Sequence, residues 1–328
     1  MRAWQVGALG EPGEVMRLHQ DVPQPVPAEG QLLVKVLAAS VNFPDALMCR
    51  GQYQIRPPLP FTPGVELCGE VEGTGTGVPP AGGWGRVIGT PVLPVGAFAE
   101  YTLMDAAAVF PAPAALDDAE AAALHIGYQT AWFGLHRRAA LRAGETLLVH
   151  AAAGGVGSAA VQLGKAAGAT VIAVVGGAEK AVVARELGAD VVIDRRSEDF
   201  VAAVKAATGG RGADVVFDPV GGEAYAGSTK CVAFEGRILV VGFASGTIPA
   251  PGLNHALVKN YSVLGLHWGL YATRDPQSVR DAHAELTALA AKGVVRPLVS
   301  ERLPFERAAE GVQRVADGVS TGRIVVLP

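Results

Sequence analysis

Cysteine is scarce in this sequence, and its few cysteines lack a metal-binding arrangement. The chain of 328 residues has only three, Cys49, Cys68 and Cys231. They form no CxxC pair, and none of the seven histidines lies at ligand spacing from a cysteine or another histidine. We therefore expect no metal site, and we expect buried, reduced thiols in a cytoplasmic protein.

Long apolar runs and clusters of positive charge are also missing. The amino-terminal segment, MRAWQVGALGEP, lacks the apolar core of a signal peptide, and no uninterrupted run of about twenty apolar residues is present. The net charge is −4, with no cluster of Lys and Arg. From these absences we expect that the protein binds neither a membrane nor a nucleic acid. A G-x-S-x-G segment is absent too, which argues against a serine hydrolase.

The length and composition of the chain predict two domains. The chain is 50% hydrophobic and longer than one ordinary core requires. Its first hundred or so residues hold short strand-like segments between turns rich in Pro and Gly, which is typical of an irregular, barrel-like β fold. These segments are Gln31–Leu37, Val65–Val71, Arg86–Val92 and Ala97–Leu103. We assign residues 1–123 and 265–328 to this β-rich catalytic and substrate domain, because the last part is expected to pack back on the first.

A regular alternation of strands and helices occupies the middle of the chain. Apolar strands of three to six residues alternate with helical stretches of about ten residues, which predicts an α/β fold with a doubly wound parallel sheet, the Rossmann type. The expected strands are Thr146–His150, Thr170–Val175, Val191–Ile193, Asp214–Asp218 and Arg237–Val241. We assign residues 124–264 to this dinucleotide-binding domain. A helix is also expected over residues 305–317, near the end of the chain.

The stretch from Thr146 to Ala169 has the order of a phosphate-binding unit: a buried strand, a glycine turn and a helix. The turn has the pattern A-x-G-x-x-G, with Ala152 in place of the first glycine and with Gly154 and Gly157. Glycine lets the backbone approach a pyrophosphate, and the helix N-terminus offers unpaired N–H groups. The flanking strand and helix favour a dinucleotide site over a plain tight turn.

The second strand of this unit indicates which dinucleotide binds. Proteins that bind a ribose 2′-hydroxyl carry an acid at the strand tip, but here the strand runs into Gly176 and Gly177. Lys180 follows, and Arg195 and Arg196 come after the third strand. Space and cations favour a 2′-phosphate, hence NADPH over NADH. The alternative is that these three cations are solvated surface charges.

A polar segment in the first domain offers candidates for catalysis. Asn42 has donors and acceptors for a carboxamide or a substrate carbonyl, and Tyr53 can supply a proton. The residues alone support other readings equally well, in which Asn42 is a turn residue, Asp45 a helix cap and Tyr53 a packing aromatic.

Together these segments resemble the medium-chain dehydrogenase/reductase superfamily, and within it the zinc-independent NADPH:quinone oxidoreductases. The resemblance spans essentially the whole chain, and its most specific pieces are residues 150–157, VNFPDALMCRGQY, PFTPGVE and residues 218–222. It implies a GroES-like catalytic domain beside the Rossmann domain. Zinc-dependent members have a cysteine where Asn42 stands and a histidine where Val65 stands, so the resemblance also implies a metal-free enzyme.

The resemblance implies roles for individual residues. Asn42 would lie beside the nicotinamide carboxamide, and Tyr53 matches the proton donor of related enoyl-thioester reductases. Related quinone reductases often have Tyr where Arg195 stands. The implied cofactor-binding residues are Asn42, Thr130, Gly154, Gly155, Val156, Gly157, Gly176, Gly177, Lys180, Arg195, Val220, Gly242 and Phe243.

The expected reaction is hydride transfer from NADPH to a quinone or a similar activated α,β-unsaturated carbonyl. Without a metal to polarise a carbonyl, the acceptor has to be electron-poor already. Two alternatives stay open: an NADPH-dependent enoyl-thioester (enoyl-CoA) reductase, and an NADPH-binding structural or regulatory protein with little catalysis. A homodimer is expected as well, since in relatives the strand that matches the apolar segment Tyr261–Leu266 pairs across a two-fold axis.

Overall fold

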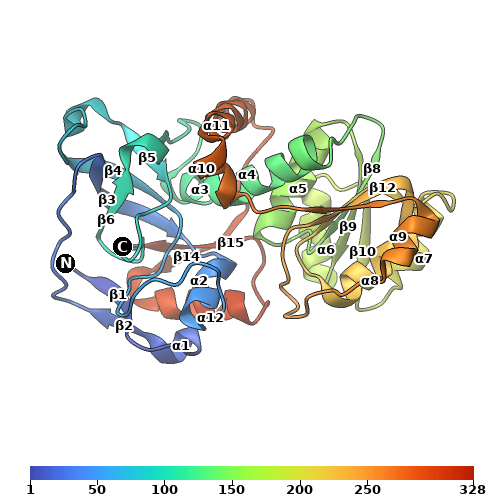
Figure 1. Cartoon of the computed structure of the whole chain (residues 1–328), viewed down its shortest axis with the longest axis horizontal. Helices are drawn as coiled ribbons and strands as arrows, with labels where there is room; N and C mark the ends of the chain where they lie inside the picture. The colour runs from blue at the N-terminus through green and yellow to red at the C-terminus, as the bar shows by residue number, and fades with distance from the viewer. The chain divides into compact units, whose positions relative to one another are not determined.

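The computed structural model describes residues 1–328, and its backbone contacts divide the chain into two compact units. The first unit comprises Met1–Ile126 and Thr287–Pro328, and the second comprises Gly127–Leu286. In Figure 1 the first unit therefore contains both the blue and the red end of the chain. Residues 265–286 fall in the second unit, although the sequence places them with the first. The domain boundaries predicted from the sequence stay a prediction, because contacts within one structure do not test which parts of the chain fold independently.

The second unit is built on a six-stranded parallel sheet. Its order is β10-β9-β8-β11-β12-β13, so the chain starts at the centre, winds to one edge and then to the other (Figure 1). This is the strand order of a doubly wound dinucleotide-binding sheet, whose ligands bind where the winding reverses, here at β8 and β11. The predicted fold class is confirmed. The strands are β8 (Thr146–His150), β9 (Thr170–Val175), β10 (Val191–Asp194), β11 (Ala213–Asp218), β12 (Val232–Val240) and β13 (Ser262–Gly265).

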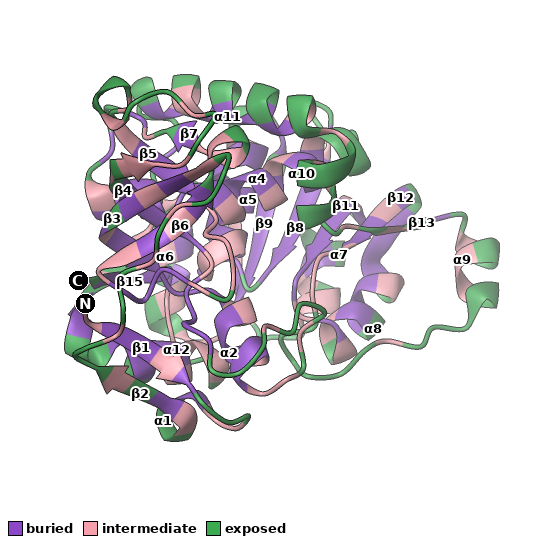
Figure 2. Ribbon diagram, turned by 60° about the vertical axis from the view of Figure 1, so that its left-hand side comes forward, coloured by how far each residue is buried: buried purple, intermediate pink, exposed green.

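Helices follow the strands as the alternation predicts. They are α5 (Gly155–Ala166), α6 (Ala178–Glu186), α7 (Phe200–Ala207) and α8 (Gly222–Cys231). The central strands are buried on both faces, as Figure 2 shows for β8, β9 and β11, because helices cover both faces of such a sheet. The core on one face is formed by apolar side chains that include Leu148, Ile172, Val216 and Ile238. Before the sheet, α4 (His125–Trp132) continues as a π-helix (Phe133–Arg138).

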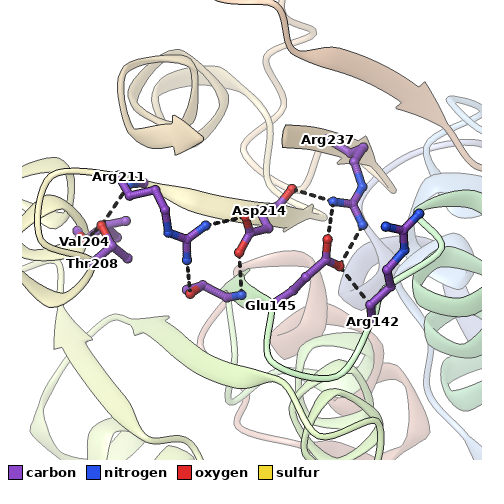
Figure 3. Close-up of polar contacts among 9 residues, drawn as sticks. Arg142, Glu145, Val204, Thr208, Arg211, Asp214 and Arg237 are labelled. Atoms are coloured by element: carbon purple, nitrogen blue, oxygen red, sulfur yellow. Dashed lines mark hydrogen bonds and ion pairs between the residues drawn. The ribbon is translucent and has the colours of Figure 1, made fainter. Parts of the chain in front are cut away.

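A charged network connects Arg237 of β12 with the amino ends of β8 and β11 (Figure 3). The guanidinium of Arg237 donates from Nη1 and Nη2 to the two carboxylate oxygens of Glu145, both at 2.9 Å, and from Nε to the Ala139 carbonyl at 2.9 Å. Asp214 accepts from the Thr146 backbone N–H at 2.7 Å and pairs with Arg211. The amino end of the sheet is thus closed by bidentate, charge-assisted hydrogen bonds.

The end of the second unit carries its most exposed apolar surface. It contains α9 (Leu253–Lys259), α10 (Gly269–Arg274) and the start of α11 (Pro276–Ala291). Leu253, Leu257 and Val258 of α9 are more than 70% exposed, at 79%, 77% and 74%, and Figure 2 shows this helix far from the buried strands of its own unit. β13 pairs with β12 only and is an edge strand. None of the helices combines the length and hydropathy that crossing a bilayer requires.

The first unit is β-rich and irregular, as predicted. β1 (Ala3–Val6) and β2 (Met16–His19) form a hairpin-like pair, and the main sheet has the order β14-β15-β3-β4-β5-β7, with β6 on β3. Its strands are β3 (Gln31–Ser40), β4 (Leu67–Thr74), β5 (Arg86–Gly89), β6 (Tyr101–Asp105), β7 (Phe110–Pro111), β14 (Val299–Pro304) and β15 (Arg323–Leu327). The carboxyl-terminal strand β15 runs antiparallel to the end of β3, where Val325 faces Ser40. This register places the start of β15 beside the residues that follow β3.

Several predicted strands differ from the observed ones in their bounds, such as Arg86–Val92, of which only Arg86–Gly89 is a strand. Two differences have a visible cause or an additional turn. The predicted strand Ala97–Leu103 begins only at Tyr101, because the backbone of Ala97 and Phe98 bonds to Gly64 and Pro63 instead of to a ladder. The predicted helix over residues 305–317 begins with one 3₁₀ turn, Phe305–Arg307, before α12 (Ala308–Ala316). The remaining short helices of this unit are α1 (Pro12–Val15), α2 (Phe43–Cys49) and α3 (Asp118–Ala122), with 3₁₀ turns at Ala81–Gly83 and Ala106–Ala108.

The Arg237–Glu145 pair should stabilise the sheet in a pH-dependent way. Its hydrogen bonds with Arg237 lower the pKa of Glu145. A carboxyl whose pKa is lower in the folded state stabilises the fold above its unfolded pKa and loses this effect as the pH falls through the folded pKa. Glu145→Gln should therefore lower the free energy of unfolding by about 2 kcal/mol at neutral pH, and the difference from the parent should shrink below about pH 4.

Urea denaturation of the parent and of Glu145→Gln, at neutral pH and below about pH 4, measures this effect. Glu310→Gln is the matched control, because its pair with Arg307 is exposed on both sides (45% and 50%) and should contribute little. A loss for Glu145→Gln that stays the same at both pH values would contradict the prediction.

Candidate functional site

The glycine turn after β8 brings the start of α5 against the backbone of the turn. A Cβ on Gly157 would lie 2.1 Å from the Ala151 carbonyl oxygen and 2.9 Å from the Cα of Ala152, so only glycine fits. Ala151 itself has a positive φ of 49°. Gly154 is the N-cap and has no side chain to bond the first N–H groups of α5. These groups therefore remain available to a ligand at the amino end of a twelve-residue helix.

The tip of β9 is surrounded by cations. Gly177 has a φ of 108°, which favours glycine. The Arg195 guanidinium comes within 3.4 Å of the place a Cβ on Gly176 would take, and the Arg196 guanidinium within 3.0 Å of the one on Gly177. Desolvation first, then Arg196 and Arg195, lower the pKa of Lys180. The structure thus brings the predicted cations together around the Gly-Gly tip.

Asp194, at the end of β10, also lies at the tip of β9, and the sequence analysis missed it. Its Oδ1 accepts from the backbone N–H groups of Gly177 (2.8 Å) and Arg196 (3.0 Å). These hydrogen bonds, that from Arg196 first, lower its pKa. The parallel pairing of β10 with β9 brings the acid to the strand tip, and its position at the end of an expected strand was the signal available in the sequence.

The loops after β11 and β12 join one another at the same edge of the sheet. Oδ1 of the buried Asp218 accepts from the N–H of Val220 (2.8 Å) and of Gly221 (3.0 Å). The Gly242 N–H donates to the Asp218 carbonyl at 3.4 Å. The side chain of Phe243 lies against Gly221 and is 36% exposed. The second unit thus gathers all of its predicted site residues except Thr130 at the carboxyl ends of the strands, while Thr130 lies partly exposed on α4.

His150, at the end of β8, has a structural hydrogen bond. Its Nε2 lies 2.8 Å from Oγ of Ser228, which donates to the Ala224 carbonyl at 2.7 Å. Because Ser228 uses its proton there, Nε2 of His150 is the donor. Burial lowers the pKa of His150 to about 4, so it is neutral at physiological pH.

In the first unit, Asn42 lies in a cluster of buried polar side chains. Asn42 is the N-cap of α2, and its Nδ2 donates to the Ser40 carbonyl (3.1 Å) and to Oε2 of Glu66 (2.9 Å). Its Oδ1 accepts from Nη1 of Arg323 at 2.5 Å. Three of the four hydrogen bonds that the carboxamide can make are therefore formed within the chain.

Two carboxyl groups in this cluster are fully buried. Oδ2 of Asp45 accepts from the Asn42 N–H (2.8 Å) and Oδ1 from the Gly64 N–H (3.0 Å), so Asp45 does act as a helix-capping residue. Oε1 of Glu66 accepts from the Ile126 N–H at 2.6 Å. Desolvation raises the pKa of Asp45 to about 7 and raises that of Glu66 as well.

Tyr53 is half-buried and packs against the apolar core of the first unit. Desolvation, and then the negative charge of Asp45, raise the pKa of its phenol. The hydroxyl therefore keeps its proton at neutral pH, which a proton donor requires. Its roles as packing aromatic and as proton donor are compatible.

Arg323 is the residue of this cluster that the sequence analysis missed. It is 6% exposed, and its Nη1 lies 4.0 Å from Oε2 of Glu66. The signal was a single arginine in the otherwise apolar strand RIVVL. The sequence gives no reason to connect it with residues about 280 positions earlier, a separation that the pairing of β15 with β3 closes.

Comparisons with known proteins agree with both units. The family model described as an alcohol dehydrogenase GroES-like domain matches residues 28–114, and the one described as a zinc-binding dehydrogenase matches residues 155–288. A quinone oxidoreductase-like protein 2 homolog of Nematostella vectensis is 38% identical over 299 residues, which cover 90% of this chain and 81% of that protein. Quinone oxidoreductase-like protein 2 of Bos taurus is 35% identical over 326 residues, 99% of this chain and 93% of its own.

The chain belongs to the quinone oxidoreductase family of medium-chain dehydrogenases/reductases. A solved structure, Escherichia coli quinone oxidoreductase complexed with NADPH, agrees with a TM-score of 0.91 at 30% identity, and the match covers the whole of both chains. The predicted family and fold are thus confirmed, and the chain is a reductase of the medium-chain type.

One family model carries zinc in its description, which raises the question of whether the residues around Asn42 fit that ion. They do not fit. No group of three or more His, Cys, Asp or Glu side chains is placed to hold a metal, and an amide stands beside Glu66, whose Oε2 already faces the guanidinium of Arg323. A zinc site is closed by three or four ligands, which are usually thiolates and imidazoles.

Proposed function

We propose that this family member transfers a hydride from NADPH to a quinone or a similar activated α,β-unsaturated carbonyl. The observation that carries the choice of cofactor is the convergence of Lys180, Arg195 and Arg196 on the Gly176–Gly177 tip. Converging cations suit a 2′-phosphate. The Escherichia coli enzyme complexed with NADPH supports this choice.

The proposed NADPH site uses the carboxyl end of the parallel sheet. Gly155, Val156 and Gly157 would hold the pyrophosphate with backbone N–H groups, since a helix N-terminus favours phosphate. Gly154, whose own N–H donates to the Ala151 carbonyl at 2.8 Å, would let the backbone come close to the ligand. The other residues proposed to bind the cofactor are Asn42, Thr130, Gly176, Gly177, Lys180, Arg195, Val220, Gly242 and Phe243. When bound, NADPH supplies the hydride.

The chain's own residues would orient the reactants and manage one proton. Asn42 keeps one lone pair on Oδ1 for a carboxamide N–H. Tyr53 would give its phenolic proton to the oxyanion or carbanion that forms on the acceptor after hydride addition, or only line the pocket if solvent supplies that proton. No step in this scheme requires a metal.

Replacing one cation at the Gly-Gly tip should discriminate between the two nicotinamide cofactors. Lys180→Ala should raise the KM for NADPH by about tenfold to a hundredfold and leave the KM for NADH nearly unchanged, because charge-assisted hydrogen bonds to the 2′-phosphate are lost. Steady-state oxidation of each cofactor with a panel of quinones measures this. Arg185→Ala, on the exposed side of the same helix α6, is the control.

Equal effects on both cofactors would contradict the NADPH assignment. If the parent binds NADPH but oxidises it with no quinone, enone or enoyl-CoA, the enzymatic proposal fails and the structural or regulatory alternative takes its place. A gel-shift with RNA run beside this assay would test nucleic-acid binding, which we do not expect.

A second candidate, reduction of an enoyl thioester, rests on the half-buried phenol of Tyr53, whose hydroxyl is protonated at neutral pH and has a proton to give. A carbanion formed next to a thioester needs a proton at carbon, and general acids of this kind contribute about a hundredfold to ten-thousandfold. Tyr53→Phe should lower kcat with crotonyl-CoA by at least about a hundredfold and change quinone reduction far less. A loss of the same size for both acceptors would leave no preference for either.

The proposal includes a homodimer formed through the edge strand β13. Its outer edge is unpaired, and Val263 on it is 42% exposed. Exposed edges are normally covered, and a two-fold axis covers one with a second copy. Light scattering should give twice the mass of the 33.6 kDa chain, and Val263→Lys should shift it toward the monomer. A parent that is monomeric at micromolar concentration removes this part of the proposal.

The predicted cytoplasmic location is kept as part of the proposal, because all three cysteines are free and buried. Cell fractionation tests it.

A further inference from the structure

Arg323 joins three segments that are far apart in the sequence. Its guanidinium enters the cluster from the start of β15, Asn42 enters from the N-terminus of α2, and Glu66 immediately precedes β4. Nη1 of Arg323 reaches Oδ1 of Asn42 at 2.5 Å and Oε2 of Glu66 at 4.0 Å, while Nδ2 of Asn42 reaches the same Oε2 at 2.9 Å. The three side chains form a closed triangle inside the first unit.

The guanidinium determines which way the Asn42 carboxamide faces. A guanidinium can only donate hydrogen bonds, and an ionised carboxylate can only accept them. The oxygen of the carboxamide must therefore face Arg323 and its nitrogen must face Glu66, which is the arrangement observed. Without Arg323, only Glu66 and the Ser40 carbonyl would orient the amide.

The burial of Arg323 is energetically unfavourable, so a structural role alone does not explain it. Its Nε and Nη2 are buried and have no hydrogen-bond partner, and unmet buried donors destabilise a fold. A buried ion pair is also often no more stable than apolar side chains of the same volume. Its geometry therefore suggests a role in the site.

We infer that Arg323 is a positioning residue: its guanidinium orients the Asn42 carboxamide and balances the charge of Glu66. The orienting half of this inference rests on the proposed role of Asn42 in holding the nicotinamide. The charge-balancing half does not depend on it.

The charge-balancing half is tested without any assay of activity. Glu66 is an acid whose pKa is higher in the folded state, so its ionisation destabilises the fold as the pH rises. Burial raises the pKa of Glu66 and of Asp45, and the positive charge of Arg323 opposes this rise in both. In Arg323→Met the urea midpoint should therefore fall more steeply than in the parent between about pH 5 and about pH 8. Adding Glu66→Gln should remove most of the extra slope.

The orienting half is tested by kinetics on the same proteins. Arg323→Met/Glu66→Gln should melt within about 4 °C of the parent, but its kcat with NADPH and a quinone should fall by about tenfold to a hundredfold, as for a misplaced reacting group. Arg323→Lys should recover part of the loss, since an ammonium still donates to Oδ1. Arg307→Met, at an exposed arginine of the same unit, is the control and should match the parent.

Each of these measurements has an outcome that overturns part of the inference. An unchanged pH slope in Arg323→Met overturns charge balance, and parent values of kcat and KM in the double variant overturn orientation. A double variant that melts more than about 10 °C lower assigns Arg323 to folding and overturns the inference. If the parent oxidises no NADPH at all, the proposed function and the orienting half fail together, and the pH arm still decides the charge-balancing half.

Discussion

The arrangement of the first unit depends on one group that is energetically unfavourable to bury, the carboxylate of Glu66. Burial of a carboxylate costs far more than one hydrogen bond returns, so it requires several partners at once. These come from the N-terminus of α2, from the backbone of Ile126 and from the start of β15. The carboxylate therefore holds the end of the chain, the first polar loop and the exit toward the second unit at a single point.

In the second unit, the two ends of the parallel sheet are chemically different. The amino end has fixed charge pairs around Arg237 and Glu145. The carboxyl end has glycines, unbonded helical N–H groups and converging cations. Parallel strands place all their carboxyl ends together, so this end of the sheet can leave donors unpaired for a ligand. The amino end, with its charge pairs, contributes rigidity.

Much of the second unit was predictable from the sequence, whereas the polar cluster of the first unit was not. Apolar strands alternating with helices define the doubly wound sheet, and the glycine spacing around Gly157 marks its turn, because both are local signals. Asn42 was noticed for its residue type, but Arg323 and Asp194 were not found. Their roles come from strand pairing between distant segments, which periodicity does not encode, and the start of the strand at Tyr101 was likewise set by distant partners.

The carboxylate of Asp194 has a consequence for how cofactor choice can change during evolution. An acid already stands beside the tip of β9, at the end of the neighbouring strand β10, and two backbone N–H groups bind its Oδ1 and hold it in the loop. Removing the neighbouring cations would weaken the hold on a phosphate without freeing this acid for a ribose hydroxyl. A switch of specificity in this lineage would therefore need a rebuilt loop, and single substitutions would yield proteins that bind either cofactor poorly.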